Sequence, residues 1–306
     1  MHPALSIIVF STISGLGYGL AAMLGLGLLD PAALATKLAH VVALALIAAG
    51  LISSTLHLGN PQRAWRAFSQ WRSSWLSREG VLAIITFAPL TWSAAASWWS
   101  GAYHPLPGLL GVLLAAATVY CTSMIYASLK SVDAWHTRLT PACYLLFATA
   151  GGSLLATVFA LSGGGSARAT LLLAAVSLIA AWSVKLFWWK RLRTLVPRSS
   201  TASATGLGHV GQVNLFERPH TNENYLTREM GYQIARKHAD KLRRIALALG
   251  AVVPALILAM LLLITPAEGI ALAAAFATLC FGAGLFVERW LFFAEGRHAV
   301  MNYYGR

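Results

Sequence analysis

Residues 80–129 read GVLAIITFAPLTWSAAASWWSGAYHPLPGLLGVLLAAATVYCTSMIYASL and contain no Asp, Glu, Lys or Arg. A transmembrane helix needs roughly 20 consecutive apolar residues, so this stretch is long enough for two. It is divided at Ser100-Gly-Ala-Tyr-His-Pro-Leu-Pro107, where prolines and polar residues interrupt the apolar pattern. We therefore predict two membrane-spanning helices joined by a short loop.

The rest of the chain follows the same pattern. Charge-free stretches also occur at 1–29, 38–62, 139–167, 169–184, 245–267 and 269–287. The whole chain is 58% hydrophobic and 11% charged, whereas a soluble domain carries about 25% charged residues. We predict an all-α integral membrane protein, a bundle of about eight transmembrane helices with short loops. The expected spans are 4–28, 37–57, 80–99, 108–129, 140–161, 168–188, 245–265 and 269–287.

The first span is expected to remain in the mature protein. It lacks a positively charged segment before it and is too long for the apolar part of a signal peptide. Gly15 and Gly19 have the four-residue spacing that lets two membrane helices pack closely. We expect these glycines to serve helix packing.

The net charge of +13 is distributed as a topology signal and does not indicate nucleic-acid binding. With eight spans, the loops 58–79, 130–139 and 189–244 and the C-terminus lie on one side and carry nearly all Lys and Arg, with Lys185 at a helix end. The opposite side carries Lys37 and Arg168. Positive loops stay inside, so we expect a multi-pass protein of the bacterial inner membrane with both termini in the cytoplasm.

We predict one membrane anchor domain over residues 1–306. Within it, residues 190–244 form a long cytoplasmic insertion, an extramembrane loop followed by an amphipathic helix. Met230, Ile234, His238 and Leu242 recur at four-residue spacing with basic residues between them, which is typical of a helix. This helix either lies on lipid headgroups or forms a docking surface for a soluble subunit.

The sequence predicts no cofactor bound by this chain. Cys121, Cys143 and Cys280 lie within expected spans, and an iron–sulfur cluster generally needs four thiolates. Haem b is usually bound by two histidines that face each other inside the bilayer. His40 and His57 instead lie near opposite ends of one expected helix, at opposite faces of the membrane. Electrons must therefore pass to or from a carrier in another chain.

His57 and Glu79 are the candidate catalytic residues. His57 ends the second expected span and Glu79 opens the third, so an antiparallel helix pair brings both to one membrane face. Together they could accept or supply the two protons that accompany quinol oxidation or quinone reduction. A structural alternative is that both stabilise helix ends, a cation at a C-terminus and an anion at an N-terminus.

The run Val287-Glu-Arg-Trp-Leu-Phe-Phe-Ala-Glu-Gly-Arg-His298 closes the last span. Its charged members lie three or four residues apart, which favours ion pairs along one face of a single helix. They are Glu288, Arg289, Glu295, Arg297 and His298.

Five motifs together resemble the membrane anchor subunits of dimethyl sulfoxide reductase, the DmsC family, over the whole chain. They are Leu56-His-Leu-Gly-Asn-Pro-Gln-Arg-Ala64, Trp75-Leu-Ser-Arg-Glu79, Met124-Ile-Tyr-Ala-Ser-Leu-Lys130, Trp135-His-Thr-Arg-Leu-Thr-Pro141 and Glu288-Arg-Trp-Leu-Phe-Phe-Ala-Glu295. Each motif is weak alone, but all five occur in the expected order and on the expected spans.

The resemblance implies an anchor for a molybdopterin catalytic subunit and a four-cluster iron–sulfur subunit, with a haem-free site for menaquinol or ubiquinol. The family's quinol-site histidine falls on His57 and its acidic partner on Glu79. Arg63 and Arg66, in the same turn, would bind the quinone or clamp the iron–sulfur subunit. The protein would then carry the quinone site of an oxidoreductase in anaerobic or sulfur respiration, but not its substrate site.

One feature departs from respiratory dimethyl sulfoxide reductases, whose catalytic subunits lie outside the cytoplasm. Here the charge bias places the His57 loop inside, which better fits the similar three-subunit sulfite dehydrogenases, where sulfite oxidation reduces quinone. A secondary transporter would need charged or unwound elements near the bilayer centre, where these spans are almost free of ionisable groups. An inert structural anchor is the remaining alternative, and it would tolerate loss of His57.

Overall fold

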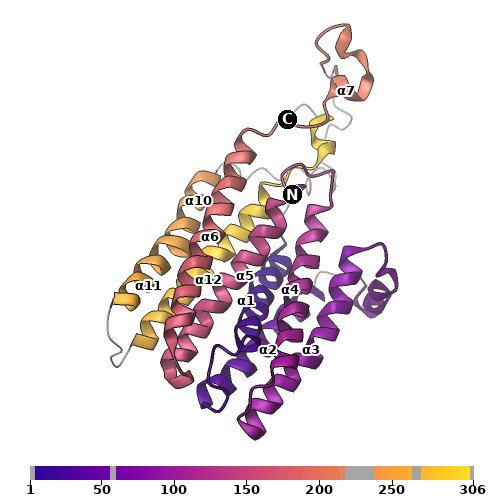
Figure 1. The fold of residues 1–306 in the computed structure, drawn as a ribbon. Coiled ribbons are helices and arrows are strands. Elements are labelled where there is room, and N and C mark those ends of the chain that lie inside the picture. The colour runs from indigo at the N-terminus through magenta and orange to yellow at the C-terminus, as the bar shows by residue number, and fades with distance from the viewer. Residues whose placement is uncertain (1–3, 56–59, 215, 218–237, 264–269, 304–306) are drawn as a thin grey trace.

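In the computed structural model, residues 4–55, 60–214, 216–217, 238–263 and 270–303 are described, and their regular elements are all helical (Figure 1). Among these described residues, eight helical segments are long and apolar enough to cross a membrane, which confirms the predicted helical bundle. The long helices are α1 (Leu5–Gly25), α2 (Leu34–Thr55), α3 (Trp75–Ser100), α4 (Pro105–Ala127), α5 (Leu139–Phe159), α6 (Ala167–Arg193), α10 (Ala239–Leu247), α11 (Val253–Leu263) and α12 (Ile270–Ala294). The shorter elements are η1 (Pro61–Gln70), η2 (Ala160–Gly164), α7 (Thr201–Thr205), η3 (Leu207–His209), η4 (Ala248–Val252) and η5 (Ala299–Tyr303).

The helices form two groups that meet along α1 and α5. The first group is α1 to α4, in which α1 packs against α2 and α4, and α3 packs against α4. The second is α5, α6, the α10–α11 segment and α12. Because α1 and α5 contact helices of both groups, they form the centre of the bundle, and their spans are its most buried ones.

Glycine permits the close contact between α1 and α5. A Cβ added to Gly19 would lie against the backbone oxygen of Ala148, and one added to Gly152 would meet the backbone of Gly19. Such small residues let membrane helices approach until their backbones touch. The other glycine of the predicted pair, Gly15, has open space around it, so only Gly19 packs backbone against backbone.

The seventh span begins earlier than the sequence suggested. It runs from Ala239 to Leu263, because α10 continues through η4 into α11 without interruption. Its first two turns are polar and basic, so they lie outside the charge-free stretch that predicts this span. Residues 218–237 of the predicted insertion lie outside the described residues, and with them most of its predicted amphipathic helix.

Pro254 explains the π-helical turn η4. Proline has no N–H, so the carbonyl of Gly250, four residues before it, loses its usual helical donor. The indole Nε1 of Trp182, on α6, donates a hydrogen bond to this carbonyl at 2.7 Å. An unpaired carbonyl is costly in hydrocarbon, and a neighbouring helix supplies the missing donor.

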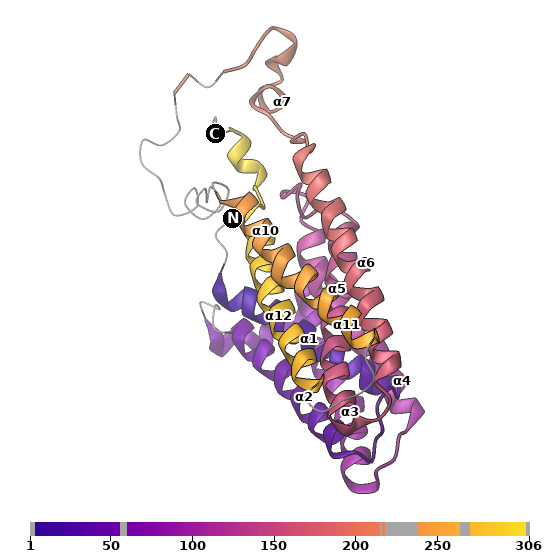
Figure 2. The same ribbon diagram turned by 90° about the vertical axis from the view of Figure 1, so that its left-hand side faces the viewer.

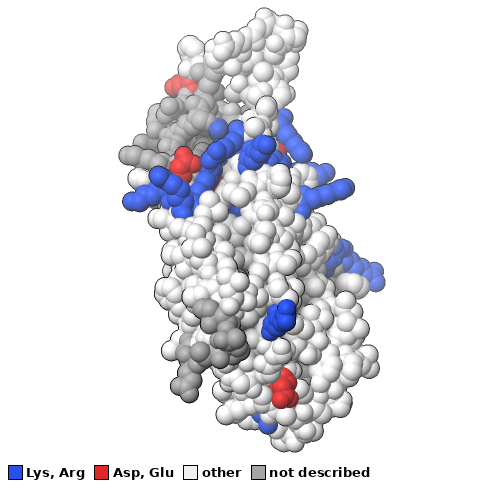
Figure 3. Space-filling model, turned by 60° about the vertical axis from the view of Figure 1, so that its left-hand side comes forward, with Lys and Arg blue, Asp and Glu red and all other residues white. Residues whose placement is uncertain are grey.

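The two ends of the bundle differ in charge. Figure 3 shows Lys and Arg side chains gathered around one end, with few at the other. The element η5, which follows α12, lies toward this basic end in Figures 1 and 2. The ends of α2, α4, α6 and α12 lie there too, as does the start of α3 that carries Glu79.

Candidate functional site

Glu79 lies in the second turn of α3, inside the bundle. The side chain of Ser74 caps this helix by accepting a hydrogen bond from the backbone N–H of Ser77. Glu79 is only 5% exposed, and its Oε1 accepts a hydrogen bond from the hydroxyl of Thr122 on α4 at 2.5 Å. A helix dipole acts mainly on the first turn, so stabilisation of the helix end does not explain this position.

Three tyrosines lie on neighbouring helices of the bundle. They are Tyr18 on α1, Tyr126 on α4 and Tyr144 on α5. The rings of Tyr126 and Tyr144 stack with their centroids 6.0 Å apart. A buried carboxyl group can exchange protons with a bound molecule.

A small cavity of about 10 Å³ lies behind Thr122. This volume has room for about one water molecule and is far too small for a quinone ring. Thr122, Tyr144, Ser11 and Arg289 supply polar groups to its wall. The Tyr144 hydroxyl is buried and has no hydrogen-bond partner among the described residues. The wall of this cavity therefore contains polar groups from Thr122 on one side to Arg289 on the other.

On that far side, three charged residues form a buried cluster that was not predicted from the sequence. Lys185 Nζ lies 2.5 Å from Glu288 Oε1, and Arg289 Nη1 lies 3.5 Å from Glu288 Oε2. The three side chains are between 0% and 2% exposed. Their cations also lie over aromatic rings, Lys185 at 3.8 Å from the ring centre of Trp188 and Arg289 at 3.7 Å from that of Tyr144.

This cluster corrects two expectations. Lys185 is not at a helix end, since α6 continues to Arg193, and Glu288 does not pair along one helix face. Glu295 pairs with Arg243 of α10, at 2.6 Å. Spacing along one helix cannot show which neighbouring helix faces a charge. The available signal was an ionisable residue inside a long apolar span, about two turns before its end.

His57 lies outside the described residues, so its predicted approach to Glu79 stays a prediction. Arg63 and Arg66 are described and are exposed on η1, the short helix between α2 and α3. No hydrogen bond or ion pair joins either of them to Glu79 among the described residues. The guanidinium of Arg66 instead lies 5.6 Å from the centre of the Trp65 ring.

The element η1 is held close to the start of α3. Arg78 donates hydrogen bonds to the backbone oxygens of Trp71, at 3.0 Å, and Arg72, at 2.6 Å. Phe68 lies so near Gly80 that an added Cβ would contact its ring. The structure thus brings the helix that carries Arg63 and Arg66 to the turn that carries Glu79, while their guanidinium groups stay exposed.

Two of the motifs quoted above meet at the basic end. The indole of Trp135 stacks on the ring of Phe292, with centroids 5.4 Å apart, and its Nε1 donates to the backbone oxygen of Phe292 at 2.8 Å. His136 Nδ1 lies 2.7 Å from the backbone oxygen of Ala127. The loop after α4 is therefore packed against the end of α12.

Burial raises the pKa of the Glu295 carboxyl above its ordinary range, against the opposing effect of Lys185 and Arg243. Glu295 lies just beyond the end of α12, at the basic end of the bundle.

Among the described residues, no group of three His, Cys, Asp or Glu side chains could hold a metal ion.

Comparison with known proteins identifies relatives over the full length. A family model described as DMSO reductase anchor subunit (DmsC) matches residues 1–294. The protein is 32% identical to the C subunit of sulfite dehydrogenase from Allochromatium vinosum over 334 aligned positions, which cover 99% of each protein. It is 31% identical to the C chain of anaerobic dimethyl sulfoxide reductase from Escherichia coli over 138 positions, covering 44% of this protein and 48% of that one.

Proposed function

This chain belongs to the DmsC family of dimethyl sulfoxide reductase anchor subunits, and from that premise we propose that it exchanges electrons and protons with a membrane quinone. The observation that carries the proposal is the buried Glu79 carboxyl, held by Thr122 near the start of α3, the helix that packs against η1. Ionisable groups inside a membrane protein are expensive and mark functional sites.

Quinol oxidation releases two protons and two electrons. Glu79 and His57 would accept the protons, and an iron–sulfur cluster in a partner subunit would accept the electrons; quinone reduction runs the same steps in reverse. The water-sized cavity behind Thr122 cannot admit the ring, so the quinone head would bind at the outer side of Glu79, near η1. Arg63 and Arg66 would bind it or contact the iron–sulfur subunit.

We place the chain in a complex of the sulfite dehydrogenase type, with a molybdopterin catalytic subunit and a four-cluster iron–sulfur subunit. The support is the full-length similarity to the C subunit of a sulfite dehydrogenase, against a partial alignment with the sulfoxide reductase protein. Electrons would then flow from sulfite to menaquinone or ubiquinone. The alternative direction, from quinol to a sulfoxide, would use the same pocket.

The first experiment follows quinone absorbance in membranes that contain the intact complex, after addition of sulfite. A matched sample receives quinol and dimethyl sulfoxide. Quinone reduction by sulfite supports a dehydrogenase anchor. Quinol oxidation by the sulfoxide alone reverses the direction and contradicts the sulfite dehydrogenase assignment.

The site is tested with Glu79→Gln, which keeps the size of the side chain but cannot take up a proton in the same way. We expect quinone turnover to fall at least about 100-fold, the usual contribution of a proton-transferring group, and a similar loss for His57→Ala. Electron transfer to ferricyanide, which bypasses the quinone, should be retained and reports assembly. Asp30→Asn, which removes an exposed carboxylate from the opposite end, is the matched control. Full quinone turnover in both site variants would refute the site.

A further inference from the structure

A groove lies between α6 and α10 at the basic end of the bundle, away from Glu79. It forms because α6 packs against α11 and η4, while α10 packs against α12. The space between the two helices is about 480 Å³, a volume within the range of small-molecule sites. The groove is separate from the proposed quinone site at Glu79.

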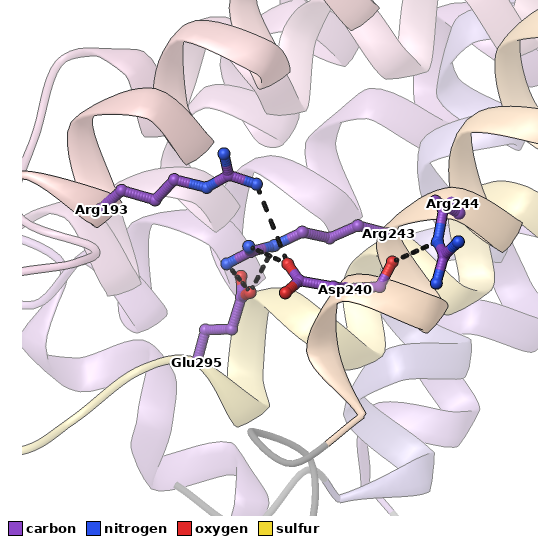
Figure 4. Close-up of polar contacts among 5 residues, drawn as sticks. All are labelled: Arg193, Asp240, Arg243, Arg244 and Glu295. Atoms are coloured by element: carbon purple, nitrogen blue, oxygen red, sulfur yellow. Dashed lines mark hydrogen bonds and ion pairs between the residues drawn. The ribbon is translucent and has the colours of Figure 1, made fainter.

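Cations from both helices surround this groove. Lys190 and Arg193 come from α6, and Arg243 and Arg244 come from α10. Figure 4 shows Arg193 and Arg243 directed toward Asp240, at 3.8 Å and 2.9 Å.

Two of these positive charges are in excess. Arg243 also binds the buried carboxylate of Glu295, at 2.6 Å, so its charge is already matched. Asp240 can balance one more cation. Lys190 and Arg244 are exposed and form no ion pair with any described residue. Arg244 Nε donates a hydrogen bond to the backbone oxygen of Asp240 at 3.4 Å, which leaves its charge unmatched, so the groove can accept an anion.

The groove is polar toward the basic end and apolar toward the membrane interior. Leu186 lies one turn below Lys190 on α6, and Leu247 lies one turn beyond Arg243 on α10. Leu186 is 49% exposed, and the exposed Phe187 continues the apolar surface beside it. An anionic group with an attached hydrocarbon chain would therefore match both halves of the groove.

We propose that this groove binds an anionic phospholipid, with its phosphate between Lys190, Arg193 and Arg244 and an acyl chain along Leu186 and Leu247. Basic pockets between transmembrane helices on the cytoplasmic side are a recurrent form of lipid headgroup site. A bound lipid would add to the contacts between α6 and α10, which include the ion pair of Arg193 with Asp240 and the position of Arg243 over the Trp189 ring. The proposal does not depend on the quinone site.

The test uses the full-length protein in detergent micelles, with binding measured by native mass spectrometry and by the shift in thermal unfolding. The probes are phosphatidylglycerol, cardiolipin and the zwitterionic phosphatidylcholine. Arg193→Gln with Arg244→Gln removes two groove cations and spares Arg243, which binds Glu295. Because a cation near an anionic lipid contributes several-fold in affinity, we expect binding of phosphatidylglycerol to weaken about 30-fold.

Lys130→Gln with Arg138→Gln is the matched control, since it removes two exposed cations from the same end of the bundle outside the groove. An equal loss in this control, or equal binding of phosphatidylcholine, would refute the lipid site. Inorganic phosphate and glycerol 3-phosphate distinguish a lipid from a free phosphate. If either one stabilises the protein as much as phosphatidylglycerol does, the groove binds phosphate and the proposed lipid is wrong.

Discussion

Glu288 balances two cations in the interior of the bundle, since its carboxylate contacts both Lys185 and Arg289. Charges buried in low-dielectric surroundings are tolerated only when they are paired. The three residues do not contribute equally, because one carboxylate faces two cations. Removal of the carboxylate leaves two unmatched cations, whereas removal of Lys185 leaves the Glu288–Arg289 pair.

We therefore expect Glu288→Gln to lower the free energy of unfolding by about 3–5 kcal/mol, the usual cost of breaking a buried pair. Lys185→Met, which keeps a long apolar side chain, should cost at least about 2 kcal/mol less. Thermal unfolding of both variants in detergent measures the order. A larger loss in Lys185→Met would show that Arg289 does not compensate Glu288.

The same residues mark the limit of what the sequence predicts. The pairing of His57 with Glu79 and the two arginines rests on the resemblance and on helix order, and it stays a prediction. The structure shows Glu79 buried near the start of α3, the helix that packs against η1. The Lys185–Glu288 contact joins residues about a hundred positions apart. Periodicity within one helix carries no information on such a contact.

At the scale of helices, the contact between α1 and α5 depends on the missing side chain of Gly19. A Cβ there would overlap the backbone of Ala148, which cannot move aside as a flexible side chain could. Gly15 lies one turn away on the same helix, with no atom of a described residue within 4 Å of its added Cβ. The two glycines therefore form a natural pair of test and control.

Gly19→Ala should lower the free energy of unfolding by about 1–3 kcal/mol or more, because an extra methyl group overpacks the crossing. Gly15→Ala should leave it unchanged or raise it by about 0.5–1 kcal/mol, since alanine is the better helix former. Thermal unfolding with the two variants side by side gives the comparison. Equal stability of the two variants would mean that the helices can separate without cost.

The helices themselves were largely predictable, because charge is excluded from hydrocarbon and its absence marks a span directly. The predicted span 140–161 corresponds to helix α5, Leu139–Phe159, and the predicted span 80–99 corresponds to helix α3, Trp75–Ser100. The short helix η1 was not predicted. Its exposed aromatic and basic residues form no apolar run, and neighbouring helix α3 holds it through Arg78.

In the whole molecule, the candidate functional features lie at the basic end of the bundle. Glu79 with η1, the groove between α6 and α10, and the contact of Trp135 with Phe292 all lie toward the basic end of the bundle. Under the proposed function, a soluble partner that exchanges electrons with a quinone near Glu79 would dock at this end. The side of the membrane that the basic end faces therefore decides the compartment in which the partner subunits lie.

We expect this end to face the cytoplasm, because loops rich in Lys and Arg are retained inside. Green fluorescent protein fused after Arg306 should fluoresce, and alkaline phosphatase fused at Gly101, between α3 and α4, should be active. Exchange of the two reporters is the control, since each is functional in one compartment only. Active phosphatase at Arg306 would place the basic end outside, and partner docking at that end would then require exported subunits. Such a result would favour the sulfoxide reductase arrangement over the sulfite dehydrogenase one.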